Sequence, residues 1–228
     1  MNNIKGVIFD YGGTLDTNGV HWFHIFRQVY AEYFPQFTEE QLREAYVYTE
    51  RYLATHRVIE PTDNFLDMLK KKVAVQLSVL KVDDAQWCIA SACDALVQRN
   101  MEEPRKVLDL LANRFPIVLV SNFYGNIHAV LQAYGLDGYF KAVIESAVVG
   151  VRKPNPQIFA LGVNALGLHP DEVLVVGDSY GKDIVPSHSL GCHTVWLKGK
   201  GWNEADEPTD SSCAKYIISN LKDLTALL

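Results

Sequence analysis

Three short polar segments of this 228-residue chain carry residues suited to catalysis. Each begins directly after an apolar, mostly β-branched run: Asp10 after Val7–Phe9, Ser121 after Ile117–Val120, and Asp178 after Val173–Gly177. Asp183 follows in the third segment, and Lys153 precedes that segment in Gly-Val-Arg-Lys-Pro-Asn-Pro. Such runs are typical of strands buried on both faces of a parallel sheet. Because open α/β sheets bind ligands at the carboxyl ends of their strands, we expect these polar residues to converge there.

The expected cluster suits a divalent cation and a phosphate group. Mg²⁺ prefers oxygen ligands such as carboxylates, usually keeps some waters, and bridges to phosphate. Lys153 would hold phosphate charge and reduce the mutual repulsion of the carboxylates. A single polar residue after a strand is more often a turn or a helix cap. The prediction of a Mg²⁺ and phosphate site therefore depends on all of these residues occurring in this order.

Helical patterns alternate with the apolar runs, which predicts an α/β fold with a mostly parallel sheet. Further strands are expected at three places, Thr194–Leu197, Ala142–Glu145 and Tyr216–Ser219, of which Ala142–Glu145 is the weaker candidate. Core helices are expected at Glu103–Phe115, Asn126–Tyr134 and Pro156–Leu166. Residues 199–212 form a polar loop by composition, and a short amphipathic segment, Asn220–Leu228, ends the chain.

The interval from Val20 to Met101 breaks this alternation, because it contains no convincing strand. It carries four helical patterns instead: Trp22–Phe34, Glu39–Thr55, Asn64–Leu80 and Asp84–Gln98. Thr38 and Gln41 form a capping-box pattern before the second, and Asp83 is placed to cap the fourth. We predict a helical module of residues 20–101 inserted into a core made of residues 1–19 and 102–228.

Composition excludes several classes of protein. A hydrophobic content of 48% is enough for a buried core and argues against wholesale disorder. The chain has 21 basic and 27 acidic residues, a net charge of −6 that disfavours nonspecific binding to nucleic acid. No apolar run approaches the roughly 18 residues of a membrane span, and the N-terminal apolar stretch stops at Asp10, unlike a signal peptide. The four cysteines lack a C-x-x-C pair, which favours reduced thiols in a cytoplasmic protein.

With these motifs in this order, the sequence resembles the haloacid dehalogenase superfamily, in the branch that carries a helical cap after the first strand. The resemblance covers nearly the whole chain. It implies a Rossmann-like core, a cap over residues 20–101 whose closure shields the site, and Mg²⁺ as cofactor. It also implies hydrolysis of a small phosphorylated metabolite, in which attack of Asp10 on phosphorus gives an aspartyl-phosphate.

The resemblance also assigns roles to single residues. Asp10 matches the nucleophile of the family's D-x-D-G-T-[LV] motif, Ser121 the hydroxyl of the second motif, and Lys153 the lysine of the third. The implied phosphate-binding residues surround them: Gly12, Gly13, Thr14, Ser121, Asn122 and Lys153. The implied metal ligands are Asp10, the carbonyl of Gly12, and the two acids of the fourth motif G-D-x-x-x-x-D, Asp178 and Asp183.

One position departs from the family's phosphatases. They place a second Asp two residues after the nucleophile, where it protonates the leaving group and then activates water, and this chain has Gly12 there. General acid–base help is worth about 10²–10⁴-fold, so we expect alkyl phosphate monoesters to be poor substrates unless another group acts. The downstream candidates are Asp16, His21 and His24, although a hinge or surface role is commoner for each.

Other reactions of the family fit less well. Dehalogenases also lack the second Asp, but they do not keep the acids that stand here as Asp178 and Asp183. Phosphonatases use Mg²⁺ and have Ala at the position of Gly12, but they need a lysine early in the cap, and residues 11–69 contain none. Phosphoglucomutase-type transfer needs the missing acid. A catalytically weak, metal- and phosphate-binding regulatory protein is the alternative from another class.

Overall fold

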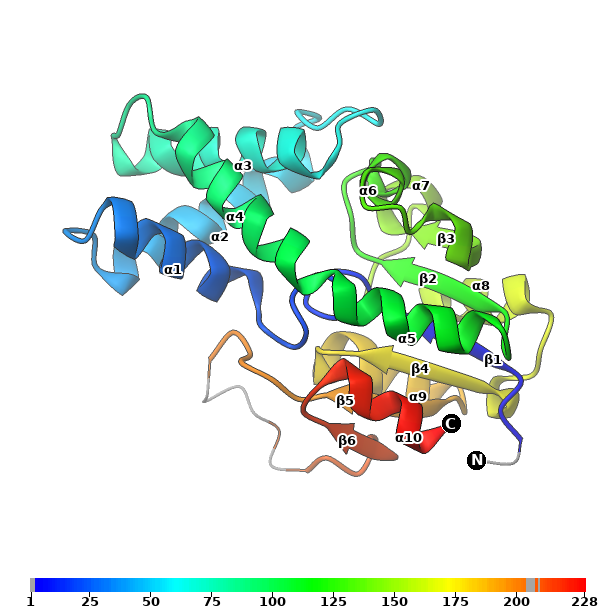
Figure 1. The fold of residues 1–228 in the computed structure, drawn as a ribbon. Helices are drawn as coiled ribbons and strands as arrows, with labels where there is room; N and C mark the ends of the chain where they lie inside the picture. Colours follow the sequence, from blue (N-terminus) through cyan, green and yellow to red (C-terminus); the bar gives the residue numbers. More distant parts are fainter. Residues whose placement is uncertain (1–2, 204–207, 209) are drawn as a thin grey trace.

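A single parallel sheet organises the chain, which a computed structural model describes over residues 3–203, 208 and 210–228 (Figure 1). Its strand order is β3-β2-β1-β4-β5-β6, and every pairing is parallel. The strands are β1 (Gly6–Phe9), β2 (Ile117–Ser121), β3 (Phe140–Glu145), β4 (Val173–Gly177), β5 (His193–Leu197) and β6 (Tyr216–Ile218). The predicted α/β class is confirmed, and so are the strands expected near Ala142–Glu145 and Tyr216–Ser219. Residues 204–207 and 209 of the expected polar loop lie outside the described residues.

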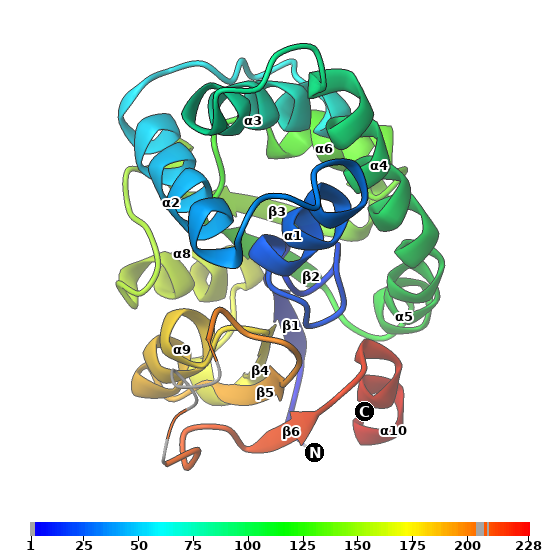
Figure 2. The same ribbon diagram turned by 90° about the vertical axis from the view of Figure 1, so that its left-hand side faces the viewer.

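Helices cover both faces of the sheet (Figures 1 and 2). The core helices are α5 (Glu102–Ala112), α6 (Ile127–Ala133), α7 (Ser146–Val149), α8 (Gln157–Leu166), α9 (Val185–Ser189) and α10 (Leu224–Leu227). Alternate residues of β1 point to opposite faces of the sheet. Val7 and Phe9 belong to the apolar cluster that includes residues of α5 and α6, and Ile8 belongs to the cluster that includes residues of α8. This explains why the central strand is apolar throughout.

Four helices lie between β1 and α5 in the chain: α1 (Trp22–Tyr33), α2 (Glu39–Thr55), α3 (Phe65–Leu80) and α4 (Gln86–Asn100). None of residues 20–101 forms a strand, as the sequence predicts. The strand arrows point toward this helical group, so it lies at the carboxyl ends of the strands (Figure 1). Among the described residues, no helix has the length and apolar character needed to cross a membrane.

Two capping predictions have different outcomes. The Thr38 and Gln41 capping box is present, with both reciprocal hydrogen bonds formed. The prediction for Asp83 is wrong, because α4 begins at Gln86 after Ala85 without a side-chain cap. Asp84 has a positive φ of 60°, which turns the chain and delays the start of the helix.

Helix α8 approaches the sheet closely at Gly162. A Cβ at this position would lie 2.9 Å from Val120 Cγ2 and 3.0 Å from Ile8 Cδ1. The loop that carries Lys153 leads directly into this helix. The missing side chain at residue 162 therefore helps to set how closely that loop sits against β1 and β2.

We expect Gly162→Val to lower the free energy of unfolding by about 1–3 kcal/mol, because it overpacks the contact between α8 and the sheet. Urea denaturation measures the change. Gly138→Val is the matched control, since a Cβ at Gly138 would meet no atom within 4 Å. Equal losses in the two variants would show that close packing at Gly162 is not the cause.

Candidate active site

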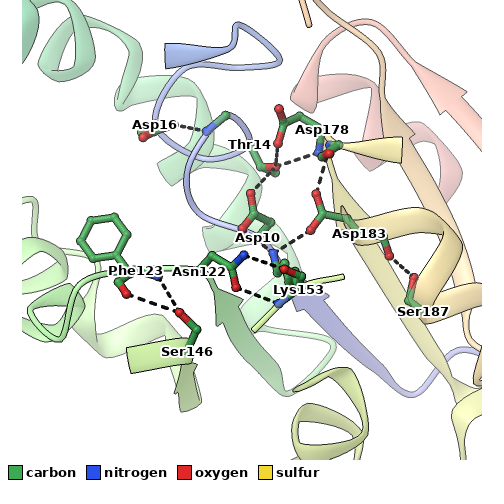
Figure 3. Close-up of polar contacts among 12 residues, drawn as sticks. Asp10, Thr14, Asp16, Asn122, Phe123, Ser146, Lys153, Asp178, Asp183 and Ser187 are labelled. Atoms are coloured by element: carbon green, nitrogen blue, oxygen red, sulfur yellow. Dashed lines mark hydrogen bonds and ion pairs between the residues drawn. The ribbon is translucent and has the colours of Figure 1, made fainter. Parts of the chain in front are cut away.

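Lys153 joins the ends of two strands through its ammonium group (Figure 3). Its Nζ lies 2.6 Å from Asp10 Oδ1 and 2.6 Å from Asp183 Oδ1. Asp10 directly follows β1, and Asp183 lies in the π-helical turn η3 (Tyr180–Ile184) after β4. All three residues are buried, and Lys153 is only 4% exposed. The structure therefore brings together the acids and the lysine that the sequence places at separate strand ends.

Thr14 connects the remaining acid to this pair. Its hydroxyl lies 3.2 Å from Asp10 Oδ2 and 3.3 Å from Asp178 Oδ1, and it accepts a hydrogen bond from Asp178 N at 3.0 Å. Carboxylate oxygens of Asp10, Asp178 and Asp183 all lie within 4.8 Å of one another. The threonine thus fixes the relative positions of the two loops that bear these acids.

The charges in this cluster do not balance, because three carboxylates face one ammonium group and leave a net charge of −2 when all are ionised. Burial raises the pKa of Asp10 to about 6, although Lys153 opposes the shift. Burial and the charges of Asp10 and Asp183 raise the pKa of Asp178 well above its usual range. Burial alone would lower the pKa of Lys153, but the two paired carboxylates outweigh it and raise that pKa. An oxygen-rich site with this excess charge fits a divalent cation.

Two glycines allow the loops to approach one another. Gly13 has a φ of +95°, and a Cβ there would run into the carboxylate of Asp178. At Gly177, a Cβ would lie 2.6 Å from Asp183 Cγ. Gly12 differs from both, because a Cβ there would meet only Asp16 Oδ2, at 4.0 Å. Steric exclusion therefore does not account for the absence of a side chain at residue 12.

Asn122 uses its side chain to hold the backbone of Lys153. Its Oδ1 accepts a hydrogen bond from Lys153 N at 2.9 Å, and its Nδ2 donates to Lys153 O at 3.1 Å. The Asn122 side chain therefore positions the Lys153 backbone, and the role of Asn122 toward phosphate stays a prediction. Ser121, the last residue of β2, is 1% exposed at the same sheet edge. Its proposed role toward phosphate stays a prediction.

Asp16 ties the loop after β1 to the first residue of α1. Its Oδ1 accepts a hydrogen bond from Gly13 N at 2.6 Å, and its Oδ2 accepts one from Trp22 Nε1 at 2.7 Å. The Gly13 N–H is therefore engaged within the loop, and the expected role of Gly13 toward phosphate stays a prediction. Asp16 is fully buried, and burial raises its pKa to about 7 against the effect of these hydrogen bonds.

The two histidines considered as proton donors have other partners. His21 accepts a hydrogen bond from Phe23 N at the start of α1, and its ring packs against Tyr46 and Trp202. Burial and the charge of Lys182 lower the pKa of His21 to about 4, so the ring is neutral near pH 7. His24 Nε2 lies 2.7 Å from Gly201 O in the loop after β5.

A buried polar contact that none of the sequence motifs indicated joins the inserted helices to the loop after β2. Lys72 of α3 lies 2.6 Å from Glu50 Oε1 of α2 and donates to Tyr124 Oη at 2.9 Å. Tyr124 in turn donates to Glu50 Oε2 at 2.6 Å. One signal was available, since Lys72 lies four residues from both Met68 and Gln76 on the buried face of its helix.

A family model described as haloacid dehalogenase-like hydrolase matches residues 4–186. Glyceraldehyde 3-phosphate phosphatase of Pyrococcus furiosus is 36% identical over 93 residues, which cover 41% of this chain and 38% of that protein. Phosphoglycolate phosphatase of Yersinia pestis is 34% identical over 117 residues, 50% of this chain and 49% of that protein. The matched part of the chain thus spans less than half the length of each of these relatives.

Solved structures share the fold over the whole chain. The putative HAD-hydrolase YfnB from Bacillus subtilis, bound to magnesium, has a TM-score of 0.61 at 16% identity, with 99% of each chain covered. L-2-haloacid dehalogenase from Xanthobacter autotrophicus has a TM-score of 0.62 at 19% identity, with 98% of each chain covered. These identities support the fold alone.

We expect Lys153→Met to lower the free energy of unfolding by about 3–5 kcal/mol in EDTA, because it leaves buried carboxylates without their cationic partner. Urea denaturation measures the loss. Lys106→Met is the matched control, since Lys106 pairs with Glu102 at the solvent-exposed surface. A loss no larger than that of the control would contradict a structural role for the Lys153 ion pairs.

Proposed function

The chain belongs to the haloacid dehalogenase-like hydrolases, and from this premise we propose that it is a Mg²⁺-dependent phosphatase of small phosphorylated metabolites. The observation that carries the proposal is the buried cluster of Asp10, Asp178 and Asp183 around Lys153, with its excess of two negative charges. The relatives named as phosphatases of glyceraldehyde 3-phosphate and phosphoglycolate support the substrate class. A cytoplasmic location stays a prediction.

Catalysis in this proposal runs through covalent attachment of the phosphoryl group to Asp10. A carboxylate oxygen of Asp10 bonds to phosphorus as the bond from phosphorus to the leaving oxygen breaks, and water then cleaves the aspartyl-phosphate. Lys153 orients Asp10 through its 2.6 Å contact and offsets charge on the phosphoryl oxygens. Ser121 provides a further phosphate contact in this proposal.

A bound Mg²⁺ would be held by Asp10, the carbonyl of Gly12, Asp178 and Asp183, and would offset charge on the phosphoryl oxygens. The ligand atoms support this assignment, because all of them are oxygens and the three carboxylates carry more negative charge than Lys153 balances. Thr14 and Lys153 hold the acids in place from opposite sides. Lys153 therefore has two functions in the proposal. It offsets charge on the phosphoryl oxygens, and it limits repulsion among the acids before the cation binds.

We propose that residues 20–101 act as a cap that excludes water from the site. Support comes from the burial of Asp10, which is 6% exposed, and from two sets of contacts between the inserted helices and the site loops. Trp22 donates to Asp16, and Lys72 contacts Tyr124. Exclusion of water strengthens electrostatic interactions at the phosphoryl group.

Lys72 bears on the choice between phosphate esters and phosphonates. It lies just beyond the lysine-free interval 11–69, and it is the buried cap lysine that contacts a loop of the core. Burial would lower its pKa, but Glu50 and Tyr46 outweigh burial and raise it. A lysine held protonated is a poor nucleophile for a Schiff base, which supports ester hydrolysis over phosphonate cleavage.

We expect the protein to hydrolyse acetyl phosphate and p-nitrophenyl phosphate in Mg²⁺ and to lose this activity in EDTA. Asp10→Asn should remove it, because no nucleophile remains. Phosphate release measures turnover, and circular dichroism checks that the variant is folded. If the folded wild-type protein binds Mg²⁺ but hydrolyses neither compound, the regulatory alternative replaces the phosphatase proposal.

Mg²⁺ should also stabilise the fold, because the folded state alone assembles its ligands. At a concentration one hundred times Kd, the expected gain is about 2.7 kcal/mol, read from urea denaturation with and without the ion. Asp178→Asn should remove most of this gain, whereas Asp137→Asn, on an exposed turn, should keep it. A full gain in Asp178→Asn would place the cation elsewhere.

A further inference from the structure

We propose that Asp16 is the proton-transfer group of this site and replaces the carboxylate that is absent at residue 12. The inference rests on the proposed phosphatase function and adds the residue that lets it act on esters with poor leaving groups. It also predicts the substrate class, because a site equipped in this way can hydrolyse alkyl phosphates as well as acyl phosphates.

The position of Asp16 supports this role directly. A Cβ at Gly12 would have Asp16 Oδ2 at 4.0 Å, and no other atom of the described residues within that distance apart from its chain neighbours. The Asp16 carboxylate, although buried, is therefore the group that a side chain at residue 12 would contact first. Gly12 itself lies two residues after Asp10, the proposed nucleophile.

A tight turn in the loop after β1 brings Asp16 back beside Gly12. The carbonyl of Tyr11 accepts hydrogen bonds from three successive N–H groups, those of Thr14, Leu15 and Asp16, at 3.2, 2.8 and 3.3 Å. The chain thereby folds over itself within a few residues. Two carboxylates, Asp10 and Asp16, thus come from the start and the end of one short loop.

Hydrogen bonds hold the Asp16 carboxylate in place without using all of its capacity. Gly13 N donates to Oδ1 and Trp22 Nε1 donates to Oδ2. A carboxylate has about four acceptor positions, so positions remain on both oxygens for a proton or a water.

The proposed proton transfers balance over the two steps. Protonated Asp16 gives its proton to the ester oxygen as the bond from that oxygen to phosphorus breaks and Asp10 bonds to phosphorus. The Asp16 carboxylate then takes a proton from water as the water oxygen bonds to phosphorus and the bond to Asp10 breaks. The products are the alcohol and inorganic phosphate, and Asp16 ends protonated as it began.

The test compares four proteins: the wild type, Asp16→Asn, Gly12→Asp, and the double variant with both changes. Each is assayed in Mg²⁺ with glycerol phosphate, phenyl phosphate and acetyl phosphate, whose leaving groups need progressively less protonation. We expect Asp16→Asn to lower kcat for glycerol phosphate by about 10²–10⁴-fold and for acetyl phosphate by much less. In the double variant, the carboxylate at residue 12 should restore at least about a tenth of the glycerol phosphate activity.

A purely structural role for Asp16 predicts a different pattern. Loss of a loop brace would lower turnover of all three substrates by a similar factor, and the double variant would restore none of it. Either result would overturn the inference, and so would a large gain for glycerol phosphate in Gly12→Asp alone, because the wild type would then lack a working acid. If Asp16→Asn does not fold, Gly12→Asp alone still decides, because a large gain for glycerol phosphate would show that the wild type lacks a working acid, and no such gain is expected if Asp16 is the acid.

Trp22→Phe provides a matched control for the hydrogen bonds around the carboxylate. It removes the donor to Asp16 Oδ2 and keeps the carboxylate itself. We expect it to change the ratio of glycerol phosphate to acetyl phosphate turnover far less than Asp16→Asn does. Failure of the underlying phosphatase proposal is distinguishable, because the wild type would then not hydrolyse acetyl phosphate in a reaction that depends on Asp10.

Discussion

The buried ion pairs of Lys153 with Asp10 and Asp183 constrain the rest of the site. A lysine that is 4% exposed remains charged only because two carboxylates lie 2.6 Å from it, and those carboxylates come from the ends of two neighbouring strands. The loop that carries Lys153 must therefore sit close against the sheet. Asn122 contributes by holding the Lys153 backbone with two hydrogen bonds, and Gly162 contributes by letting α8 approach β1 and β2.

The same cluster is built with a deficit of positive charge. One ammonium group cannot balance three buried carboxylates, and burial together with the neighbouring acids raises the pKa values of Asp10 and Asp178. A divalent cation would balance the excess negative charge of such a site. The cation and Lys153 would then together offset the negative charge of a bound phosphoryl group. Stability of the fold and the proposed chemistry thus share one electrostatic cause.

The inserted helices are connected to this cluster by polar contacts as well as by apolar packing. Lys72 and Glu50 reach Tyr124 on the loop after β2, and Trp22 reaches Asp16 on the loop after β1. Both loops continue directly from strands that carry proposed catalytic residues. Any movement of the helical group relative to the sheet would therefore break or form hydrogen bonds next to the site, which links closure of the proposed cap to the state of the loops.

The sequence alone determined the sheet, the inserted helices, and the three acids that gather near Lys153, because strand periodicity and motif order are local along the chain. It also showed that residue 12 lacks a carboxylate. Tertiary structure decided which groups lie beside residue 12 and how side chains are used. Asp16 lies beside Gly12 because the Tyr11 carbonyl closes a turn, and Asn122 holds a residue 31 positions away. The contact of Lys72 with Tyr124 spans 52 positions. Such contacts depend on how separate loops approach in space, and the spacing of residues along a chain does not encode that approach.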